Sequence, residues 1–522
     1  MQESEVLDYI KQAFELKNQG CYKQAIEMLY KTLETEIDNV EILYQLGELY
    51  FQLNNYTRAE KYLEKVLQKN PSHVESYKLL KEIYLRRNEF KNAKTAAEKV
   101  FALEGTSRNL AFLIRILSSL KEYDEIEKYI SSSRTDKEVL YEYALSFYMR
   151  KEVDKAFEIL QTISDESDNA EILKGKILFE KRDYESAREV FQKLERVTEN
   201  DEVLNYLGLF KMDDGDYTEA VKYFSKASAL NKNKSVYYYN LGNAYYLNGW
   251  FSESAASYKK AIGLEPDNAD YRYSLGYLYY SLKEFEKAEN EVKYILASNP
   301  EHAGTKVLQA LLKYENKDYL GAKSILEERL STSADDDFAK SALAKVYTEL
   351  LIFDKAEKLL ADLTEKFPQN VTYMCDFADL YIKEKKYDEA LGIIEKVIEE
   401  NENYLEAYNL GSKASLQKGD LAGAKEYAQN AISLDINCAS GYYYLSLVRA
   451  LEGDYEEAIE CMKRAIFHDI NNPEYYASMS RLYKEKGDVK SAFEYIKEAQ
   501  SLNQTSEEYK TTYKELASLN RK

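Results

Sequence analysis

The chain has 522 residues, of which 45% are hydrophobic and 31% are charged, a composition typical of a folded protein rather than a disordered one. Its formal net charge of -20 argues against binding to nucleic acid or to anionic lipid, because no basic run offsets that charge. The length is too great for a single compact core, so several domains or one repeat array are expected.

The sequence lacks the signals of secretion, membrane insertion and structural metal binding. Four cysteines stand far apart, without a C-x-x-C pair, at Cys21, Cys375, Cys438 and Cys461. This pattern indicates isolated thiols in a reducing compartment. The first residues are polar from the second onward, and no apolar stretch is long enough to cross a bilayer. We therefore expect a cytoplasmic protein with no membrane insertion.

One position, nearly always a small residue, recurs along the chain at a nearly constant interval. The sequence numbers of successive copies differ by 34, 34, 33, 30, 31 and 33, and then by 34 in all eight later steps. Apolar residues between the copies follow the i, i+3, i+4, i+7 spacing of an amphipathic helix. A fixed period of this size indicates a repeat array. The copies are Ala25, Ala59, Ala93, Ile126, Ala156, Ala187, Ala220, Ser254, Ala288, Ala322, Ala356, Ala390, Ala424, Ala458 and Ala492.

Each repeat is predicted to be a helix, a tight turn and a second helix. Glycines such as Gly215 and Gly249 fall at the midpoint, where a helix can end in the left-handed conformation. The five prolines fall at the boundaries between repeats, where a missing N–H costs little. They are Pro71, Pro266, Pro300, Pro368 and Pro473.

The repeat resembles the tetratricopeptide repeat family over residues 6 to about 503, in about fifteen units. Only Ser254, small but not alanine, departs from the family pattern in the unit that begins at Ser235. The resemblance implies an all-α, right-handed superhelical solenoid of antiparallel helix pairs. The matching positions of that unit are Tyr238, Leu241, Gly242, Tyr245, Gly249, Phe251, Tyr258, Ala261 and Pro266.

The predicted organisation has four segments. Residues 1–105 form N-terminal repeats, 106–200 irregular shortened repeats, 201–503 a regular array, and 504–522 a C-terminal capping helix. The irregular segment either kinks or divides the solenoid, or consists of degenerate repeats that stack normally. Thr505 and Glu508 have the spacing of a capping box, and Tyr509, Tyr513, Leu516 and Leu519 then fall on one face. The stretch STSADDD at 331–337 is expected to start a helix.

The resemblance implies that the first helix of each repeat lines a concave groove. In the unit from Ser235, the inward positions Tyr239, Asn243 and Tyr246 differ from the core positions. Together with the equivalent positions of neighbouring units they form an apolar, aromatic and almost uncharged strip that can contact a protein or peptide. The alternative is that these rings only pack between repeats. The candidate partner-binding residues are Asn205, Leu209, Met212, Tyr239, Asn243, Tyr246, Tyr273, Tyr277, Tyr280, Leu311 and Tyr314. A second strip, at Asn409, Lys413, Tyr443 and Leu447, is interpreted instead as a solvated, partly packed face.

No catalytic, cofactor-binding or metal-binding residue is predicted. The three histidines are isolated, and His73 and His302 are expected to be exposed turn residues. No nucleophile, phosphate-binding or metal motif is present. Some members of the family bind chaperone tails through a two-carboxylate clamp, but Lys78 is followed by Glu82 where that clamp has asparagine.

These observations predict a non-enzymatic scaffold or adaptor that binds a protein or peptide in the groove. Two alternatives stay open. The chain could regulate or recruit substrates for a separately encoded enzyme, or it could assemble with itself, because an open aromatic strip can accept a second copy.

Overall fold

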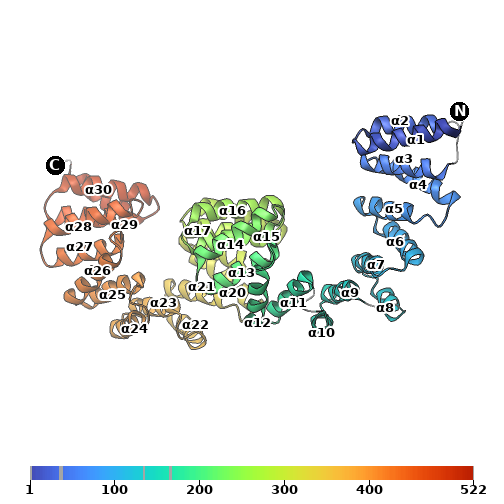
Figure 1. Ribbon diagram of the computed structural model, residues 1–522. Helices are drawn as coiled ribbons and strands as arrows, with labels where there is room; N and C mark the ends of the chain where they lie inside the picture. The colour runs from blue at the N-terminus through green and yellow to red at the C-terminus, as the bar shows by residue number, and fades with distance from the viewer. Residues whose placement is uncertain (1–2, 34–38, 133–135, 164–166, 521–522) are drawn as a thin grey trace. The chain divides into compact units, whose positions relative to one another are not determined.

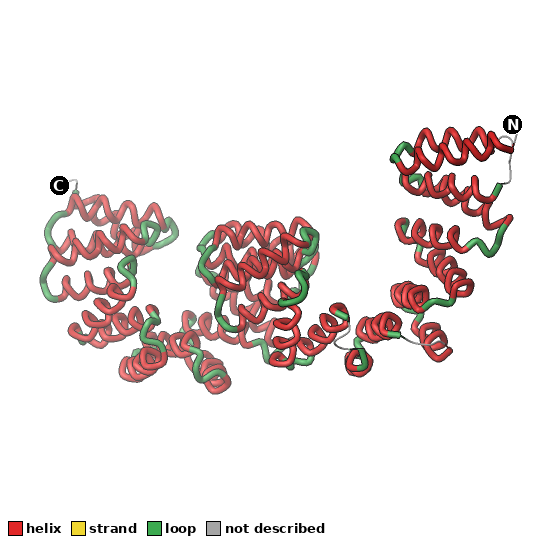
Figure 2. The backbone as a smooth tube through the Cα atoms, viewed as in Figure 1, coloured by secondary structure: helices red, strands yellow, loops and turns green. Residues whose placement is uncertain are grey.

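The computed structural model describes residues 3–33, 39–132, 136–163 and 167–520. Within these ranges every regular element is a helix, and consecutive helices are joined by short turns (Figures 1 and 2). The chain divides into two compact units of similar size. The N-terminal unit comprises Met1–Leu264 and the C-terminal unit comprises Glu265–Lys522.

The N-terminal unit contains eight consecutive helix pairs among its described residues. Its helices are α1 (Glu3–Asn18), α2 (Tyr22–Leu33), α3 (Val40–Gln52), α4 (Tyr56–Lys69), α5 (Val74–Arg86), α6 (Phe90–Glu104), α7 (Ser107–Leu120), α8 (Tyr123–Ser132), α9 (Lys137–Met149), α10 (Val153–Gln161), α11 (Asp168–Glu180), α12 (Tyr184–Glu195), α13 (Asp201–Asp213), α14 (Tyr217–Leu230), α15 (Ser235–Leu247) and α16 (Phe251–Leu264).

The C-terminal unit contains seven pairs and one further helix among its described residues. Odd-numbered helices are the first of each pair, and the last helix, α31, packs against α30. The helices are α17 (Ala269–Ser281), α18 (Phe285–Ser298), α19 (Ala303–Glu315), α20 (Tyr319–Thr332), α21 (Asp337–Glu349), α22 (Phe353–Lys366), α23 (Val371–Lys383), α24 (Tyr387–Glu400), α25 (Leu405–Lys418), α26 (Leu421–Leu434), α27 (Ala439–Leu451), α28 (Tyr455–His468), α29 (Pro473–Glu485), α30 (Val489–Leu502) and α31 (Glu507–Leu519).

The recurring small position forms the seam between the two helices of a pair. All fifteen copies, from Ala25 to Ala492, are at most 1% exposed. In the pair α15–α16, the Ser254 hydroxyl donates to the Gly242 carbonyl at 2.8 Å. A Cβ atom added to Gly242 would lie 2.6 Å from the Tyr258 ring. The helices therefore approach closely because small residues meet there, and large side chains fill the space beside them.

The turn inside each pair places one residue in the left-handed region. Gly215 and Gly249 have φ of 75° and 77°, as the sequence predicts. Other pairs use a side-chain-bearing residue at the same place, including Leu351 at φ 59° and Lys385 at φ 65°. Pro473 occupies the first turn of α29, where its missing N–H leaves no hydrogen bond unmade.

Two helices of the irregular segment are short. α8 has ten residues and α10 has nine, whereas α14 has fourteen. This shortening accounts for the two shortest intervals between copies of the small position, from Ile126 to Ala156 and from Ala156 to Ala187. The sequence SSSR at 131–134 is typical of a loop, but Ser131 and Ser132 still belong to α8, and the remainder of the stretch lies outside the described residues. The four-segment organisation, with its boundaries at 106, 201 and 504, stays a prediction.

The final helix covers the last repeat. Tyr509 and Leu516 are 7% and 0% exposed, and the Tyr509 hydroxyl donates to Glu474 at 3.0 Å. The capping-box prediction was wrong by one residue, because the hydroxyl of Ser506, not of Thr505, accepts from the Tyr509 N–H. Leu519 is 40% exposed, so the buried face ends one turn earlier than expected. Asp336 caps α21, so the acidic stretch at 331–337 does start a helix.

Candidate functional site

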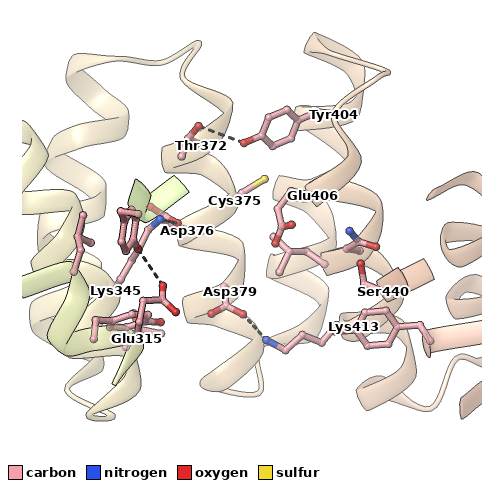
Figure 3. A pocket seen from close by; sticks show the side chains of 17 residues that line it. Glu315, Lys345, Thr372, Cys375, Asp376, Asp379, Tyr404, Glu406, Lys413 and Ser440 are labelled. Carbon is pink, nitrogen blue, oxygen red and sulfur yellow. Dashed lines mark hydrogen bonds and ion pairs between the residues drawn. The ribbon is translucent and has the colours of Figure 1, made fainter. Parts of the chain in front are cut away.

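Six successive first helices of the C-terminal unit line one cavity of about 490 Å³. These residues belong to α17, α19, α21, α23, α25 and α27, except Tyr404, which directly precedes α25. Figure 3 shows their side chains gathered between these helices. We call this space the groove cavity. It is lined by Tyr280, Leu311, Tyr314, Glu315, Lys345, Thr348, Thr372, Cys375, Asp376, Asp379, Tyr404, Glu406, Asn409, Leu410, Lys413, Ser440 and Tyr444.

The repeat period brings these side chains together. One series runs Leu311, Lys345, Asp379 and Lys413, each separated from the one before by a single repeat period. Further series with the same interval are Thr372, Glu406, Ser440 and Asp376, Leu410, Tyr444. Equivalent positions of stacked repeats lie side by side, so each series forms a row along the groove.

Both lysines of the groove cavity are already paired with aspartates. The Lys413 ammonium lies 2.5 Å from the Asp379 carboxylate, and the Lys345 ammonium lies 3.1 Å from Asp376. Ser341 also donates to Asp376 at 3.3 Å. These bonds join α21 to α23 and α23 to α25, so they hold neighbouring repeats in register as well as neutralising charge.

Two further groups have pKa values altered by their surroundings. Burial raises the pKa of the Cys375 thiol to about 12, so this thiol is protonated at neutral pH. Burial also raises the pKa of Glu406, and the negative charge of Asp379 adds to the effect. Glu406 is exposed as a whole residue, but neighbouring protein atoms displace part of the water around its carboxyl group.

Three of the predicted binding residues, Tyr280, Leu311 and Tyr314, line the groove cavity. All three are half-buried. The Tyr280 hydroxyl donates to Glu315 at 3.0 Å and the Tyr314 hydroxyl donates to Glu349 at 3.1 Å. These rings therefore have one face in the groove and a hydroxyl fixed by the next repeat.

The other two predicted residues of this unit, Tyr273 and Tyr277, do not line that cavity. Their ring centroids are 6.1 Å apart, and Tyr273 also packs beside His302 at 5.8 Å. Tyr277 meets Phe338 edge-on at 6.2 Å. Both rings are half-buried and contribute to packing between first helices.

In the N-terminal unit, the predicted asparagines make hydrogen bonds within the protein. Asn205 is 8% exposed and accepts from the Asn240 amide at 2.8 Å, which joins α13 to α15. Asn243 accepts from the Tyr258 hydroxyl at 2.7 Å. Tyr239 lies 6.0 Å from the same Tyr258 ring.

The remaining predicted residues of that unit are partly buried. Leu209 and Met212 pack against a cluster formed by α14 and α15. Tyr246 lies 5.9 Å, centroid to centroid, from Phe251 at the start of α16. Partner binding by these residues stays a prediction, and their present contacts are those of packing within the unit.

Sequence reasoning missed most of the charged lining, namely Glu315, Lys345, Asp376, Asp379 and Glu406. It selected uncharged aromatic strips and therefore stopped at Tyr314, although the same repeat period leads from Leu311 to Lys345 and Asp379. Asn409 and Lys413 were assigned to a solvated, partly packed face, but they line the groove cavity. Continuing the period without regard to polarity would have found these positions.

The histidines have structural roles. His73 and His302 lie between helices, as expected, but they are half-buried rather than exposed, and each side chain accepts the backbone N–H of the third residue of the following helix, from Ser76 and Thr305. Across the described ranges no group of three or more histidine, cysteine or carboxylate residues could hold a metal ion. In the same ranges, no helix has both the length and the apolar character of a transmembrane span.

Stacked antiparallel helix pairs whose first helices line a groove define an α-helical repeat protein. Models described as tetratricopeptide repeat match residues 18–83, 172–233, 371–404, 411–474 and 473–506, and one described as TPR repeat matches 243–283. The chain belongs to the tetratricopeptide repeat proteins, whose repeats serve as protein-interaction scaffolds and are generally not catalytic.

A solved structure shares the fold. The crystal structure of the APC/C hetero-tetramer Cut9–Hcn1 aligns with a TM-score of 0.53 and 14% identity, over 85% of this chain and 96% of that one. A tetratricopeptide repeat protein from Parabacteroides merdae aligns with a TM-score of 0.40 and 25% identity, over 48% of this chain and 98% of that one. No curated protein matches the sequence.

Proposed function

We propose that this protein is a non-enzymatic scaffold that binds an extended segment of a partner protein in the groove cavity. The observation that carries the proposal is the construction of the cavity, because six first helices contribute side chains to one space of about 490 Å³. A space of this size accommodates a few side chains of a peptide, and its row-like lining suits an extended chain.

The chemistry of the lining supports a protein ligand. Half-buried tyrosines supply apolar area with polar edges, which is the combination that protein-recognition surfaces favour. Asn409 and Thr372 add groups that can hydrogen-bond a peptide backbone. The excess of acidic residues in the chain makes nucleic acid a poor ligand.

We further propose a cytoplasmic location and a protein partner rather than a membrane partner. What supports the location is the set of four free cysteines, three of which are buried. The same groove would serve a subunit that regulates or recruits substrates for a separately encoded enzyme. In a self-assembling scaffold it would hold a second copy, which light scattering over a concentration series would detect.

The test uses the full chain and a random dodecapeptide library displayed on phage. A double variant, Thr372→Trp with Ser440→Trp, adds bulk to the groove cavity from two of its first helices, α23 and α27, on either side of α25. A matched double variant, Ser331→Trp with Thr332→Trp, adds the same bulk to exposed positions at the end of α20. Circular dichroism checks that both variants stay folded.

We expect the library to yield peptides that bind wild type and the α20 control equally. Peptide binding should fall at least about tenfold in the cavity-filled variant, because two indoles occupy the space that the peptide requires. Peptides that bind the cavity-filled variant as well as wild type, or a library that yields no binder, would overturn the proposal.

A further inference from the structure

The groove cavity contains more negative than positive charge. Four carboxylates line it, from Glu315, Asp376, Asp379 and Glu406, against the two ammonium groups of Lys345 and Lys413. Each lysine has an aspartate as its ion-pair partner, at 3.1 Å for Lys345 and 2.5 Å for Lys413. Two glutamates therefore remain without an ion pair to a lysine of the cavity.

Of these two glutamates, Glu406 has fewer interaction partners for its carboxyl group. Glu315 accepts a hydrogen bond from Tyr280. In the part of the chain that the structure describes, no side chain forms a hydrogen bond or an ion pair with Glu406. Lys413 and Lys345 lower the electrostatic cost of its charge only partly, because burial and the nearby aspartates outweigh them. An additional cation at this point would relieve that cost.

Aromatic rings lie near the unpaired carboxylate. Figure 3 shows Glu406 between α23 and α25, with Tyr404 above it and Lys413 and Asp379 below it. Tyr404 is held by a hydrogen bond with Thr372 at 3.3 Å, and Tyr444 contributes a further half-buried ring from α27. Such walls suit a long apolar stem that ends in a positive charge, through stem packing and cation–π attraction.

The arrangement favours an organic cation over a metal ion. Metal binding needs several ligands converging within about 2–3 Å of one point. Among the described residues the carboxylates of the cavity do not form such a group. They are spread over α19, α23 and α25.

We propose that the groove cavity recognises an arginine or lysine side chain of the partner peptide, with its cation at Glu406 and its stem along the tyrosine walls. This inference rests on the proposed scaffold function and adds the chemistry of the partner. It commits to a basic peptide segment; a free polyamine would present the same cation without a peptide backbone.

The experiment sequences the dodecapeptides selected by wild type and by three variants of the full chain. Glu406→Gln removes the charge at nearly constant shape, and Glu406→Lys reverses it. Glu399→Gln is the matched control, because Glu399 is an exposed residue of the second helix α24. Spermidine, added as a competitor, distinguishes a free amine from a peptide side chain.

Wild type and Glu399→Gln should enrich arginine or lysine at one peptide position, by about tenfold over acidic residues. Glu406→Gln should weaken binding of those peptides by about tenfold, as expected for loss of one close charge partner. Glu406→Lys should instead select an acidic residue at that position, which a purely structural role of Glu406 would not produce. Spermidine at millimolar concentration should not displace the peptide.

Each contrary result has a distinct meaning. If selected peptides require an open cavity but show no basic residue, or keep it with Glu406→Lys, the charge inference is wrong and the scaffold proposal stands. Displacement by spermidine would identify a free amine, not a peptide side chain, as the ligand and overturn the inference. If no selected peptide depends on the cavity, both proposals fail.

Discussion

Lys413 and Asp379 form an ion pair at 2.5 Å although a full repeat separates them in the chain, because the same slot of successive first helices lies side by side in the stack. The pair joins α25 to α23 inside the groove cavity. The lining of the groove is thus also part of the interface between repeats. Changes there are expected to affect both stability and binding.

The first prediction concerns this pair. A double-mutant cycle with Asp379→Asn and Lys413→Gln should give a coupling free energy of about 0.5–1 kcal/mol, because both side chains are only partly exposed, at 30% and 26%. Urea unfolding at low and high salt measures the coupling. It should shrink as salt rises. A coupling near zero at low salt would show that the pair contributes nothing to the interface.

The second prediction concerns Glu406. Its pKa is raised in the folded protein, so the folded state binds the proton more tightly than the unfolded state. Stability is therefore greatest below the unfolded pKa, near 4.5, and decreases as pH rises through the folded pKa. Glu406→Gln removes this pH-dependent loss. The variant should melt at a higher temperature than wild type at pH 7.5, and the difference should vanish below pH 4.

Other charged and titratable groups around Glu406 also affect how stability depends on pH. They are Asp376, Asp379 and Cys375 of α23, Lys345 of α21, Lys413 of α25, Glu315 of α19 and the tyrosines of the cavity. Burial also raises the pKa of Asp376, so this residue keeps a similar pH dependence in the variant. Equal melting temperatures of variant and wild type at pH 7.5 would contradict the assignment.

The third prediction tests the seam inside a helix pair. Ala390 is 0% exposed between α23 and α24, and leucine there would overpack the contact. Ala390→Leu should lower the free energy of unfolding by about 1–3 kcal/mol, as measured by urea titration. Glu399→Leu on the exposed face of α24 is the control and should change it by less than about 0.5 kcal/mol. An unchanged Ala390→Leu protein would place the seam elsewhere.

The fourth prediction concerns backbone strain in the turn between α21 and α22. Leu351 adopts φ 59° and is 65% exposed, so its side chain adds little burial to offset the left-handed conformation. Leu351→Gly should stabilise the protein by about 0.5–1 kcal/mol. The reciprocal change, Gly249→Ala at φ 77° in open space, should destabilise it by a similar amount. Two changes of the same sign would rule out this explanation.

Much of the fold could be predicted from the sequence because similar residue types recur at equivalent positions of successive repeats. The small residue at Ala390 and its equivalents, the glycine at Gly249 and the proline at Pro473 report close approach, a left-handed turn and a helix start. Because there are fifteen copies, the pattern stays recognisable even where a single repeat deviates from it. The capping residue of α31 was misplaced because Thr505 and Ser506 both have hydroxyls, and only the backbone geometry selects Ser506.

The residues that line the groove cavity were harder to predict from the sequence. Tyr239 and Tyr280 were both predicted to face the groove, but one packs beside Tyr258 and the other lines the groove cavity. The ring of a tyrosine reaches far enough to do either, and the outcome depends on the neighbouring repeat. The ion pair of Lys413 with Asp379 could likewise be predicted only by comparing equivalent positions of adjacent repeats.

Photo-crosslinking with a library-selected, fluorescently labelled dodecapeptide can show whether the partner lies in the groove cavity. A photoreactive phenylalanine derivative replaces Asn409, which lines the groove cavity on α25, or Glu399, which is exposed on α24. If the partner binds in the groove cavity, position 409 should give a crosslinked product and position 399 none above background. Crosslinking from position 399 without crosslinking from position 409 would show that the partner binds outside the groove.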